Sequence, residues 1–188
     1  MILTKTRTKL GAVATVMATS GFLFGAGVLS GGVAHSIGGL CNGRPASHTW
    51  LDASGQPGPT VLDGTRGDDV IIGSDGSDMI DGRGGDDMVC GGAGDNDIKV
   101  GPGGDSVVIG GPNEDDLEAE DVHSATLFGG GGDDTLDVDG TEATSYLVGG
   151  GGDDVFIHDG GGHVKVDGGP DFDDCLVSGG DEIVNCEY

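Results

Sequence analysis

The sequence repeats with a period of nine residues, and this repeat restricts the folds open to the chain more than any other feature. Four ungapped blocks run from Gly64 to Lys99: GTRGDDVII, GSDGSDMID, GRGGDDMVC and GGAGDNDIK. Each block has Gly at positions 1 and 4, Asp or Asn at position 6, and an aliphatic residue at position 8. One such unit cannot bury its apolar side alone, so the repeat predicts a stack of units.

Eight further blocks extend the period to Leu176 if single residues are skipped at Val100, Ala119 and His158, and two at Val138–Asp139. Position 8 is apolar in all twelve blocks. Its residues are Ile71, Ile80, Val89, Ile98, Val108, Leu117, Leu127, Leu136, Leu147, Phe156, Val166 and Cys175. This column predicts a continuous core along the whole stack.

The repeat predicts a tight turn at positions 1–6, where Gly permits positive φ angles, and a short strand at positions 7–9. Two blocks then make one coil, with the position-8 side chain pointing inward. The predicted fold is all-β, a right-handed parallel β-roll (β-solenoid) of about twelve nonapeptide half-coils over residues 64–176. The alternative for a chain with 42 Gly is a disordered Gly/Asp-rich linker, but the aliphatic column has no place in one.

The blocks match the nonapeptide G-G-x-G-x-D-x-U-x, and the chain resembles the RTX, or hemolysin-type calcium-binding, repeat family. The resemblance implies that Ca²⁺ lies between stacked turns, bound by backbone carbonyls and by the position-6 side chain. It implies several calcium ions and the following ligands: Asp69, Asp78, Asp87, Asn96, Asp115, Asp134, Asp154 and Asp173.

Alternate blocks stack on the same edge of such a roll, so the position-6 residues fall into two rows. One row contains Asp78, Asn96, Asp115, Asp134, Asp154 and Asp173 at spacings of 18 to 20 residues. The other begins with Asp69 and Asp87 and continues with Ser106, Ala125, Ser145 and Val164. We therefore expect a calcium ladder on one edge and a mostly metal-free opposite edge beyond about residue 100. Asn96, a neutral amide, should give a weaker site.

The strongly negative net charge of the chain favours a cation as its binding partner. The chain has 33 acidic and 8 basic residues and a net charge of −25. This balance excludes nucleic acid and anionic lipid surfaces, which are bound through Lys and Arg. Carboxylate and carbonyl oxygens are the ligands that hard divalent cations prefer. Crowded carboxylates and a Gly-rich backbone oppose folding without metal, so calcium binding should drive folding.

The N-terminal residues have the order of a secretory signal peptide. Lys5, Arg7 and Lys9 precede an uncharged stretch from Leu10 to Ala34 that ends in small residues. We expect a signal peptide over residues 1–34, a secreted product and no membrane attachment after cleavage. A retained anchor is the alternative, because the uncharged stretch is long enough to span a bilayer. Residues 35–63 should cap the open end of the roll, and residues 177–188 should form a closing strand.

Four cysteines follow this segment: Cys41, Cys90, Cys175 and Cys186. An even number in an exported chain predicts two disulfides, which could be connected in three ways. Cys175 with Cys186 would close a short loop and leave Cys41 with Cys90, and four free thiols are the alternative. An N-terminal signal together with cysteines resembles the small exported calcium-binding proteins of high-GC Gram-positive bacteria rather than Gram-negative hemolysins.

The sequence contains neither an H-E-x-x-H motif nor a G-x-S-x-G motif. His158 and His163 flank a Gly triplet and are expected in a solvated turn. We therefore expect a secreted calcium-binding protein that is not an enzyme. The alternatives are a cell-surface or matrix interaction scaffold, with an unidentified partner on the metal-free edge, and a hydrolase accessory or cryptic enzyme.

Overall fold

The computed structural model describes residues 40–47, 53–56, 58–177 and 180–187. The predicted signal peptide lies outside the described residues. Within them every regular element is a β-strand. None of these residues forms a helix of the length and apolar character needed to cross a bilayer.

The described residues form sixteen strands. They are β1 (Leu40–Cys41), β2 (Arg44–Pro45), β3 (Val61–Asp63), β4 (Val70–Ile72), β5 (Met79–Asp81), β6 (Met88–Cys90), β7 (Asp97–Val100), β8 (Asp105–Gly111), β9 (Asp116–Glu120), β10 (Ser124–Gly131), β11 (Thr135–Asp139), β12 (Thr144–Gly151), β13 (Val155–His158), β14 (His163–Asp167), β15 (Asp174–Val177) and β16 (Glu182–Val184).

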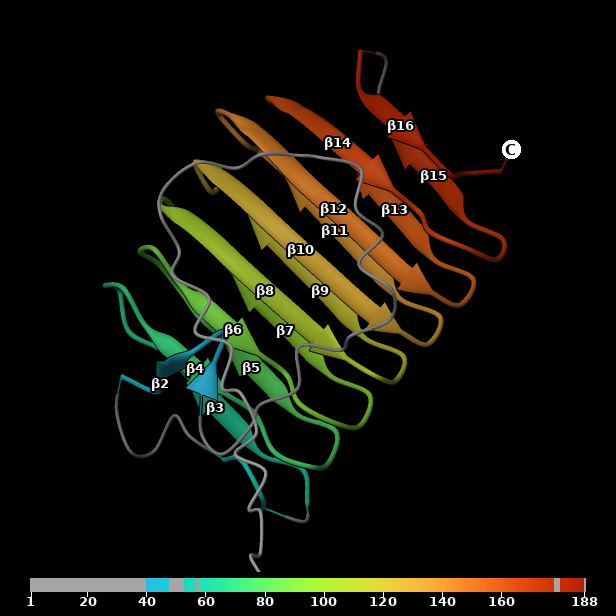
Figure 1. The fold of residues 1–188 in the computed structure, drawn as a ribbon. Coiled ribbons are helices and arrows are strands. Elements are labelled where there is room, and N and C mark those ends of the chain that lie inside the picture. Colours follow the sequence, from blue (N-terminus) through green and yellow to red (C-terminus); the bar gives the residue numbers. More distant parts are fainter. Residues whose placement is uncertain (1–39, 48–52, 57, 178–179, 188) are drawn as a thin grey trace, which may run out of the picture.

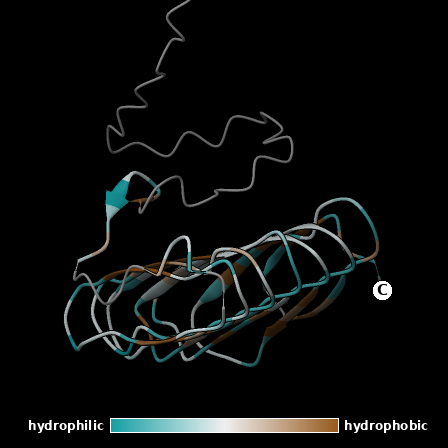
Figure 2. Ribbon diagram, turned by 90° about the horizontal axis from the view of Figure 1, so that it is seen from below, coloured by the Kyte–Doolittle hydropathy of each residue, from teal (hydrophilic) through white to brown (hydrophobic). Residues whose placement is uncertain are grey.

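Strands β3 to β16 alternate between two parallel sheets. In the described part of the chain, β3, β5, β7, β9, β11, β13 and β15 form the odd sheet, and β4, β6, β8, β10, β12, β14 and β16 form the even sheet. Each consecutive pair of strands is one turn of a coil (Figure 1). Seen from below, the chain is a flattened tube whose two layers of strands are joined by mostly polar turns (Figure 2). The predicted all-β parallel solenoid is confirmed.

The twelve blocks coincide with strands β4 to β15, but the described solenoid has one more strand at each end. Strand β3 lies in the segment predicted to be a cap, although residues 55–63 have Gly at positions 1 and 4 and Leu62 at position 8 of a further block. It continues the odd sheet, with Leu62 in register with Ile80. Strand β16 pairs with β14, so Ile183 lies beside Val166. The half-coil count is therefore slightly higher than predicted.

The position-8 column forms the core. All twelve predicted side chains are buried, and Leu62 extends the column toward the N-terminus. Parallel register stacks them directly, as in Leu117, Leu136 and Phe156 on β9, β11 and β13. Burying one such side chain contributes about 1.5–3 kcal/mol, so the column is the main apolar contribution to the stack.

The residues that interrupt the nine-residue period form a second core column. Val100, Ala119, Val138 and His158, which a strict repeat skips, all point inward and are buried. They lie at or next to the last residue of odd-sheet strands and are therefore at the edge where the chain crosses to the even sheet. The first three pack with Ala125 and other apolar residues of that edge. Longer half-coils thus fill one edge of the roll with side chains.

The N-terminal segment covers one margin of the even sheet. The backbone amides of Ser47 and Ala53 donate to the carbonyls of Val70 and Ile72 on the edge strand β4, at 3.0 and 2.8 Å. Cys41, in the β1–β2 hairpin, packs on the outer face of the same sheet beside Ile72 and Cys90. Figure 2 shows this hairpin outside the tube. The segment therefore contacts a sheet face as well as the end of the stack.

Two disulfides are present, and they have the connectivity in which a C-terminal pair closes a short loop. Cys41 bonds to Cys90, and Cys175 bonds to Cys186. The first holds the N-terminal hairpin against β6. The second joins β15 to the residues that follow β16, which places the end of the chain against the last coil.

Candidate calcium ladder

The eight predicted ligands occupy two buried rows inside the turns. Turns that lead from the even to the odd sheet form the ladder edge, with Asp78, Asn96, Asp115, Asp134, Asp154 and Asp173. Turns that lead from the odd to the even sheet form the opposite edge, with Asp69 and Asp87 first. Each of the eight side chains is at most 3% exposed. Acidic side chains at this depth need partners.

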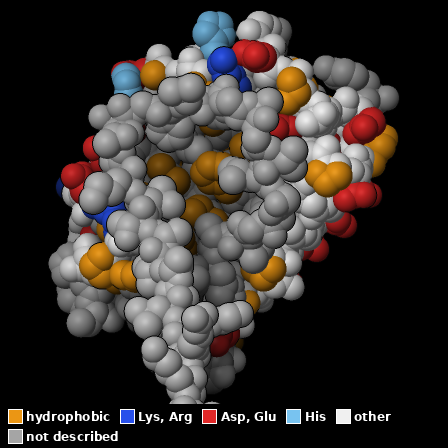
Figure 3. Space-filling view, in the orientation of Figure 1, with side chains coloured by type: hydrophobic (Ala, Val, Ile, Leu, Met, Phe, Trp, Pro, Cys, Tyr) orange, Lys and Arg blue, Asp and Glu red, His pale blue; other side chains and the backbone are white. Residues whose placement is uncertain are grey.

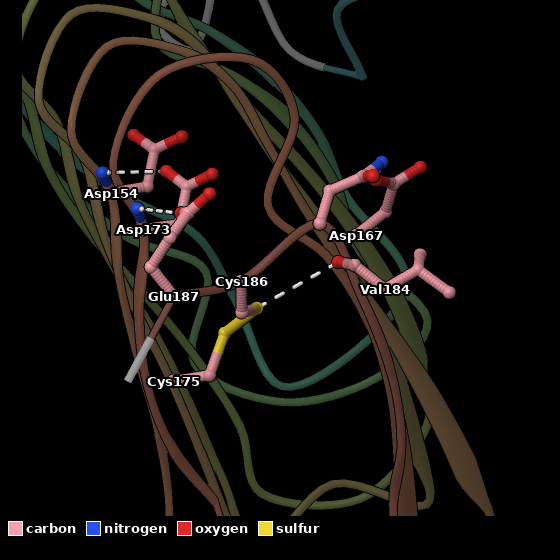
Figure 4. Close-up of a disulfide and its surroundings, with 8 residues drawn as sticks. Asp154, Asp167, Asp173, Cys175, Val184, Cys186 and Glu187 are labelled. Carbon is pink, nitrogen blue, oxygen red and sulfur yellow. Dashed lines mark hydrogen bonds between the residues drawn. A yellow bond between two sulfur atoms is a disulfide. The ribbon is translucent and has the colours of Figure 1, made fainter.

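One oxygen of each ladder carboxylate bonds to the preceding coil. The backbone amide of Asp115 donates to Oδ1 of Asp134 at 2.9 Å, and that of Asp134 donates to Oδ1 of Asp154 at 2.9 Å. The amide of Asp154 donates to Oδ1 of Asp173 at 3.0 Å. Figure 4 shows this last step. Position 6 therefore links neighbouring coils.

The second carboxylate oxygen has no partner in five of these residues. Among the described residues, the buried side-chain oxygens without a hydrogen bond are Oδ2 of Asp87, Asp115, Asp134, Asp154 and Asp173. Burying a polar atom without a partner costs about 1–3 kcal/mol, and more when the group is charged. A repeated cost of this kind at equivalent positions points to a cation as the intended partner.

A carbonyl oxygen from the next coil lies near the unpartnered oxygens of Asp115 and Asp154. A Cβ added at Gly110 would lie against Oδ2 of Asp115 and the carbonyl oxygen of Gly129. At Gly149 it would lie against Oδ2 of Asp154 and the carbonyl oxygen of Gly168. Position 1 must therefore be Gly, because any side chain would fill this space. Carboxylate and carbonyl oxygens together are calcium ligands.

The turn that contains Asp134 also needs Gly at position 4. In Gly132, φ is +112°, a conformation that side-chain-bearing residues rarely adopt. A Cβ there would collide with the backbone of Asn113 and Glu114 in the preceding coil. The Gly pattern of the sequence is thus explained by close stacking of the turns.

The five carboxylates with an unpartnered Oδ2 also have raised pKa values. Burial raises the pKa of Asp134 to about 8, those of Asp87 and Asp115 to about 7, and that of Asp154 to about 6. Burial also raises the pKa of Asp173. Neighbouring carboxylates raise these pKa values further, while the backbone amide bonded to Oδ1 lowers them. These side chains must either bind a proton or receive a cation.

Asp69 and Asp78 differ, because hydroxyl groups satisfy them. The amide and Oγ1 of Thr65 donate to Oδ2 of Asp69 at 2.6 and 2.9 Å. The amide of Ser74 donates to Oδ2 of Asp78, and its Oγ donates to Oδ1 at 2.7 Å. Thr65 and Ser74 occupy position 2, which is Gly in the turns of Asp115, Asp134 and Asp154.

Asn96 is satisfied as well. Its Nδ2 donates to the carbonyl of Gly94 at 3.0 Å and to Oδ1 of Asp115 at 2.8 Å, while its Oδ1 accepts from the amide of Asp78 at 3.0 Å. The eight predicted ligands thus divide into three with complete hydrogen bonding and five with an oxygen that needs a partner.

The opposite edge contains an ion pair in its last coil. The amide of Val164 donates to Oδ1 of Asp181 at 3.0 Å, as in the ladder, and Oδ2 of Asp181 lies 3.1 Å from Nδ1 of His158. Nε2 of His158 lies 2.8 Å from the carbonyl oxygen of Gly161. With Asp181 ionised, both oxygens accept, so both ring nitrogens must carry a proton for both bonds to form.

This arrangement corrects the expectation for His158, which is buried rather than solvated, whereas His163 is exposed. The reason is the extra residue in its half-coil, which turns the His158 side chain inward. Asp181 shows how a position-6 carboxylate is satisfied inside this fold. One oxygen takes a backbone amide, and the other takes a positive charge.

The surface around the ladder edge is acidic. Asp133 and Asp153, at position 5, are exposed next to the buried Asp134 and Asp154. Figure 3 shows acidic side chains along the right-hand margin, where these turns lie. Within the described residues, no three His, Cys, Asp or Glu side chains converge on one point. A cation in the ladder would therefore take backbone carbonyls as well as single carboxylates.

Two acidic residues of the C-terminal tail were missed by the repeat pattern. Asp181 ends the opposite edge, and Glu187 ends the ladder, where its Oε2 accepts from the amide of Asp173 at 3.0 Å. Glu187 follows no Gly-rich turn, so the nine-residue pattern contains no signal for it. Asp181 does follow Gly179 and Gly180 and precedes Ile183 by two residues, the spacing of positions 6 and 8, so a further block could have been read there. The structure places them at the ends of the two rows.

Comparison with protein families agrees with this geometry. The RTX calcium-binding nonapeptide repeat model matches four copies, over residues 63–98 and 126–140. These ranges include Asp69, Asp78, Asp87, Asn96 and Asp134. Asp115, Asp154 and Asp173 lie outside them but occupy the same structural position. No curated protein and no solved structure matched the chain.

Proposed function

Because the chain carries RTX calcium-binding nonapeptide repeats, we propose that it is a secreted protein whose β-roll folds as it binds several calcium ions. The continuous row Asp115, Asp134, Asp154 and Asp173 supplies the main ligands, and Asp87 supplies one on the opposite edge. The observation that carries this proposal is the buried, unpartnered Oδ2 of each of these residues. Each needs a cation, and oxygen ligands favour calcium.

Calcium acts here as a folding ligand. Ordering a Gly-rich backbone costs entropy, and closing the stack brings buried carboxylates within one coil of each other. A cation between coils removes the repulsion and gives each Oδ2 a partner, so its binding free energy becomes folding free energy. The aliphatic column then provides the apolar burial that holds the folded stack together.

The remaining predicted ligands have weaker roles in this proposal. Asp69, Asp78 and Asn96 already have hydrogen-bond partners within the fold. They stabilise the first turns with or without metal, so the N-terminal coils depend less on calcium. The roll would then fold from a calcium-independent N-terminal end into a calcium-dependent C-terminal half.

Secretion is part of the proposal. RTX calcium-binding repeats are typical of extracellular proteins, and the two disulfides fit an oxidising compartment. Calcium modules outside the cell typically bind at about 10⁻⁴–10⁻³ M. Such a chain would remain unfolded in the low-calcium cytoplasm and fold after export.

The test is a calcium titration followed by far-UV circular dichroism, from chelator to about 10 mM, with magnesium as the control. A calcium-specific transition to β-structure supports the proposal. A chain that stays disordered at every calcium concentration, or that has its full β-signal in chelator at pH 8, contradicts it.

A second function, a surface or matrix interaction scaffold, is favoured by one observation. Val61 and Met79 are neighbours on the outer face of the odd sheet, and their side chains are 72% and 57% exposed. Exposed apolar neighbours can contact a partner. Comparing V61S/M79S with the wild type in cell-envelope binding, with calcium and with chelator, tests this function.

We further propose that the chain has no catalytic activity of its own. This follows from the absence of catalytic motifs in the sequence. Turnover of any ester, peptide or glycoside in a broad hydrolase screen at millimolar calcium would overturn it.

A further inference from the structure

The C-terminal tail ends the ladder with residues that are not part of any nonapeptide. Strand β16 continues the even sheet, and the amide of Gly168 donates to the carbonyl of Val184 at 3.1 Å. After β16 the chain turns back across the ladder edge, where Cys186 is bonded to Cys175. Figure 4 shows Glu187 beside Asp173 in this turn.

The backbone register places Glu187 one residue beyond the ladder position. Its amide donates to the carbonyl of Asp173 at 2.9 Å, and it is bridged to Asp174. In the preceding coil, Asp174 makes the same bond to the carbonyl of Asp154 at 2.8 Å. Glu187 is thus at position 7, and position 6 is Cys186, whose sulfur is engaged in the disulfide.

Glu187 nevertheless makes the bond that a position-6 carboxylate makes elsewhere. Its Oε2 accepts from the amide of Asp173 at 3.0 Å, just as Oδ1 of Asp173 accepts from the amide of Asp154 at 3.0 Å. The extra methylene of Glu lets its carboxylate reach back by one residue. The ladder therefore continues into the tail through a different residue type.

The tail also supplies the carbonyl oxygen of the next coil. A Cβ added at Gly168 would lie against Oδ2 of Asp173 and the carbonyl oxygen of Asn185. At Gly149 the equivalent atoms are Oδ2 of Asp154 and the carbonyl oxygen of Gly168. Asn185 thus takes the place of a position-1 Gly carbonyl, although it belongs to no Gly-rich turn.

We propose that the tail completes a terminal calcium site formed by Asp173, the carbonyl of Asn185 and the carboxylate of Glu187. This inference rests on the proposed function. Asp173 is fully buried and its Oδ2 has no partner among the described residues, so a cap made only of hydrogen bonds would leave this oxygen unsatisfied. The Cys175–Cys186 disulfide holds the two tail ligands against the last coil.

The substitution E187Q separates a ligand from a simple cap. A Gln side chain keeps the length and can still accept from the amide of Asp173, but it removes the negative charge that favours calcium. E182Q is the matched control, because Glu182 is exposed on β16 and pairs with Lys165 at 2.7 Å. Both variants change the net charge equally.

The measurement is the number and affinity of bound calcium ions, by equilibrium dialysis and isothermal titration calorimetry on the whole chain. We expect E187Q to bind one ion fewer, or to bind one ion at least tenfold more weakly, while E182Q matches the wild type. A wild-type titration for E187Q overturns the terminal site. A wild-type chain that binds no calcium overturns the proposed function instead.

If E187Q does not fold, the wild-type protein still decides the question. The side-chain carboxylate carbon of Glu187, assigned by NMR in the calcium-loaded ¹³C-labelled chain, should shift when calcium is replaced by a lanthanide ion. A Glu187 resonance that does not move, while that of Asp134 does, overturns the terminal site.

Discussion

Asp134 and Asp115 lie one coil apart, and Oδ1 of Asp134 accepts a hydrogen bond from the amide of Asp115 at 2.9 Å while its Oδ2 has no partner among the described residues. The two oxygens of one carboxylate thus have different roles. The first belongs to the protein's own hydrogen-bond network, and the second is available to a cation. This division allows each role to be tested separately.

D134N should weaken calcium binding without breaking the ladder. The Asn oxygen can still accept from the amide of Asp115, but the charged second oxygen is lost. We expect roughly tenfold weaker binding at that site, measured by calorimetric titration. D133N is the control, because Asp133 is exposed and its Oδ1 only accepts from the amide of Asp153. Equal effects of the two substitutions would contradict the ladder assignment.

The calcium-free roll should be more stable in acid than at neutral pH. The pKa values of Asp154, Asp115 and Asp134 in the fold are about 6, 7 and 8, above the value of about 3.9 for an unfolded Asp. Their raised pKa values favour folding below pH 4, and this contribution is lost as the pH rises through 6 to 8. Calcium should restore the fold at pH 8.

Circular dichroism in chelator between pH 4 and pH 8.5 measures this effect. The ordinary pKa of a carboxyl is about 4, so a loss of β-signal between pH 6 and 8 reports the buried carboxyls with raised pKa values. The variant D115N/D134N/D154N should show a much smaller change in that window. A metal-free signal that is constant, or that rises with pH, would count against buried carboxylates as its cause.

V138A should destabilise the roll without changing calcium stoichiometry. Val138 is fully buried on the opposite edge, where side chains fill the roll. Removing two methyl groups there should lower the free energy of unfolding by about 2 kcal/mol. The measurement is chemical unfolding at saturating calcium, with V155A on the half-buried outer face as the control. A lost calcium ion would show that this edge also binds metal.

H158L should be costly, and D181N should partly rescue it. Without the imidazole, the nearly fully buried Asp181 carboxylate loses its cation, which should cost about 3–5 kcal/mol. In the double variant H158L/D181N, the Asn oxygen can still accept from the amide of Val164, and no buried charge remains. Thermal unfolding in saturating calcium measures both. A double variant less stable than H158L would argue against the ion pair.

The repeat pattern was sufficient to predict the coil, the position-8 core and the two rows of position-6 side chains. These features are periodic because every coil meets the same neighbours. The residues that interrupt the period were treated as gaps, yet Val100, Val138 and His158 are core residues of the opposite edge. The nine-residue pattern could not predict the burial of these residues, because they are insertions between its blocks.

The predicted ligands show the same limit. All eight match the motif at position 6, but Thr65 and Ser74 satisfy two of them through hydroxyl groups that the motif does not register. Whether a buried carboxylate needs a cation depends on every donor around it. Those donors come from the same turn and from coils about twenty residues away.

The sequence by itself determined the architecture of this protein. A nine-residue period of Gly, Asp and aliphatic residues is compatible with one kind of stack, since each requirement is local and repeats in every coil. Tertiary structure alone decided which carboxylates lack a partner, which edge is filled by side chains, and how Asp181 and Glu187 end the two rows. These depend on contacts between coils and at the ends of the stack, where the period no longer applies.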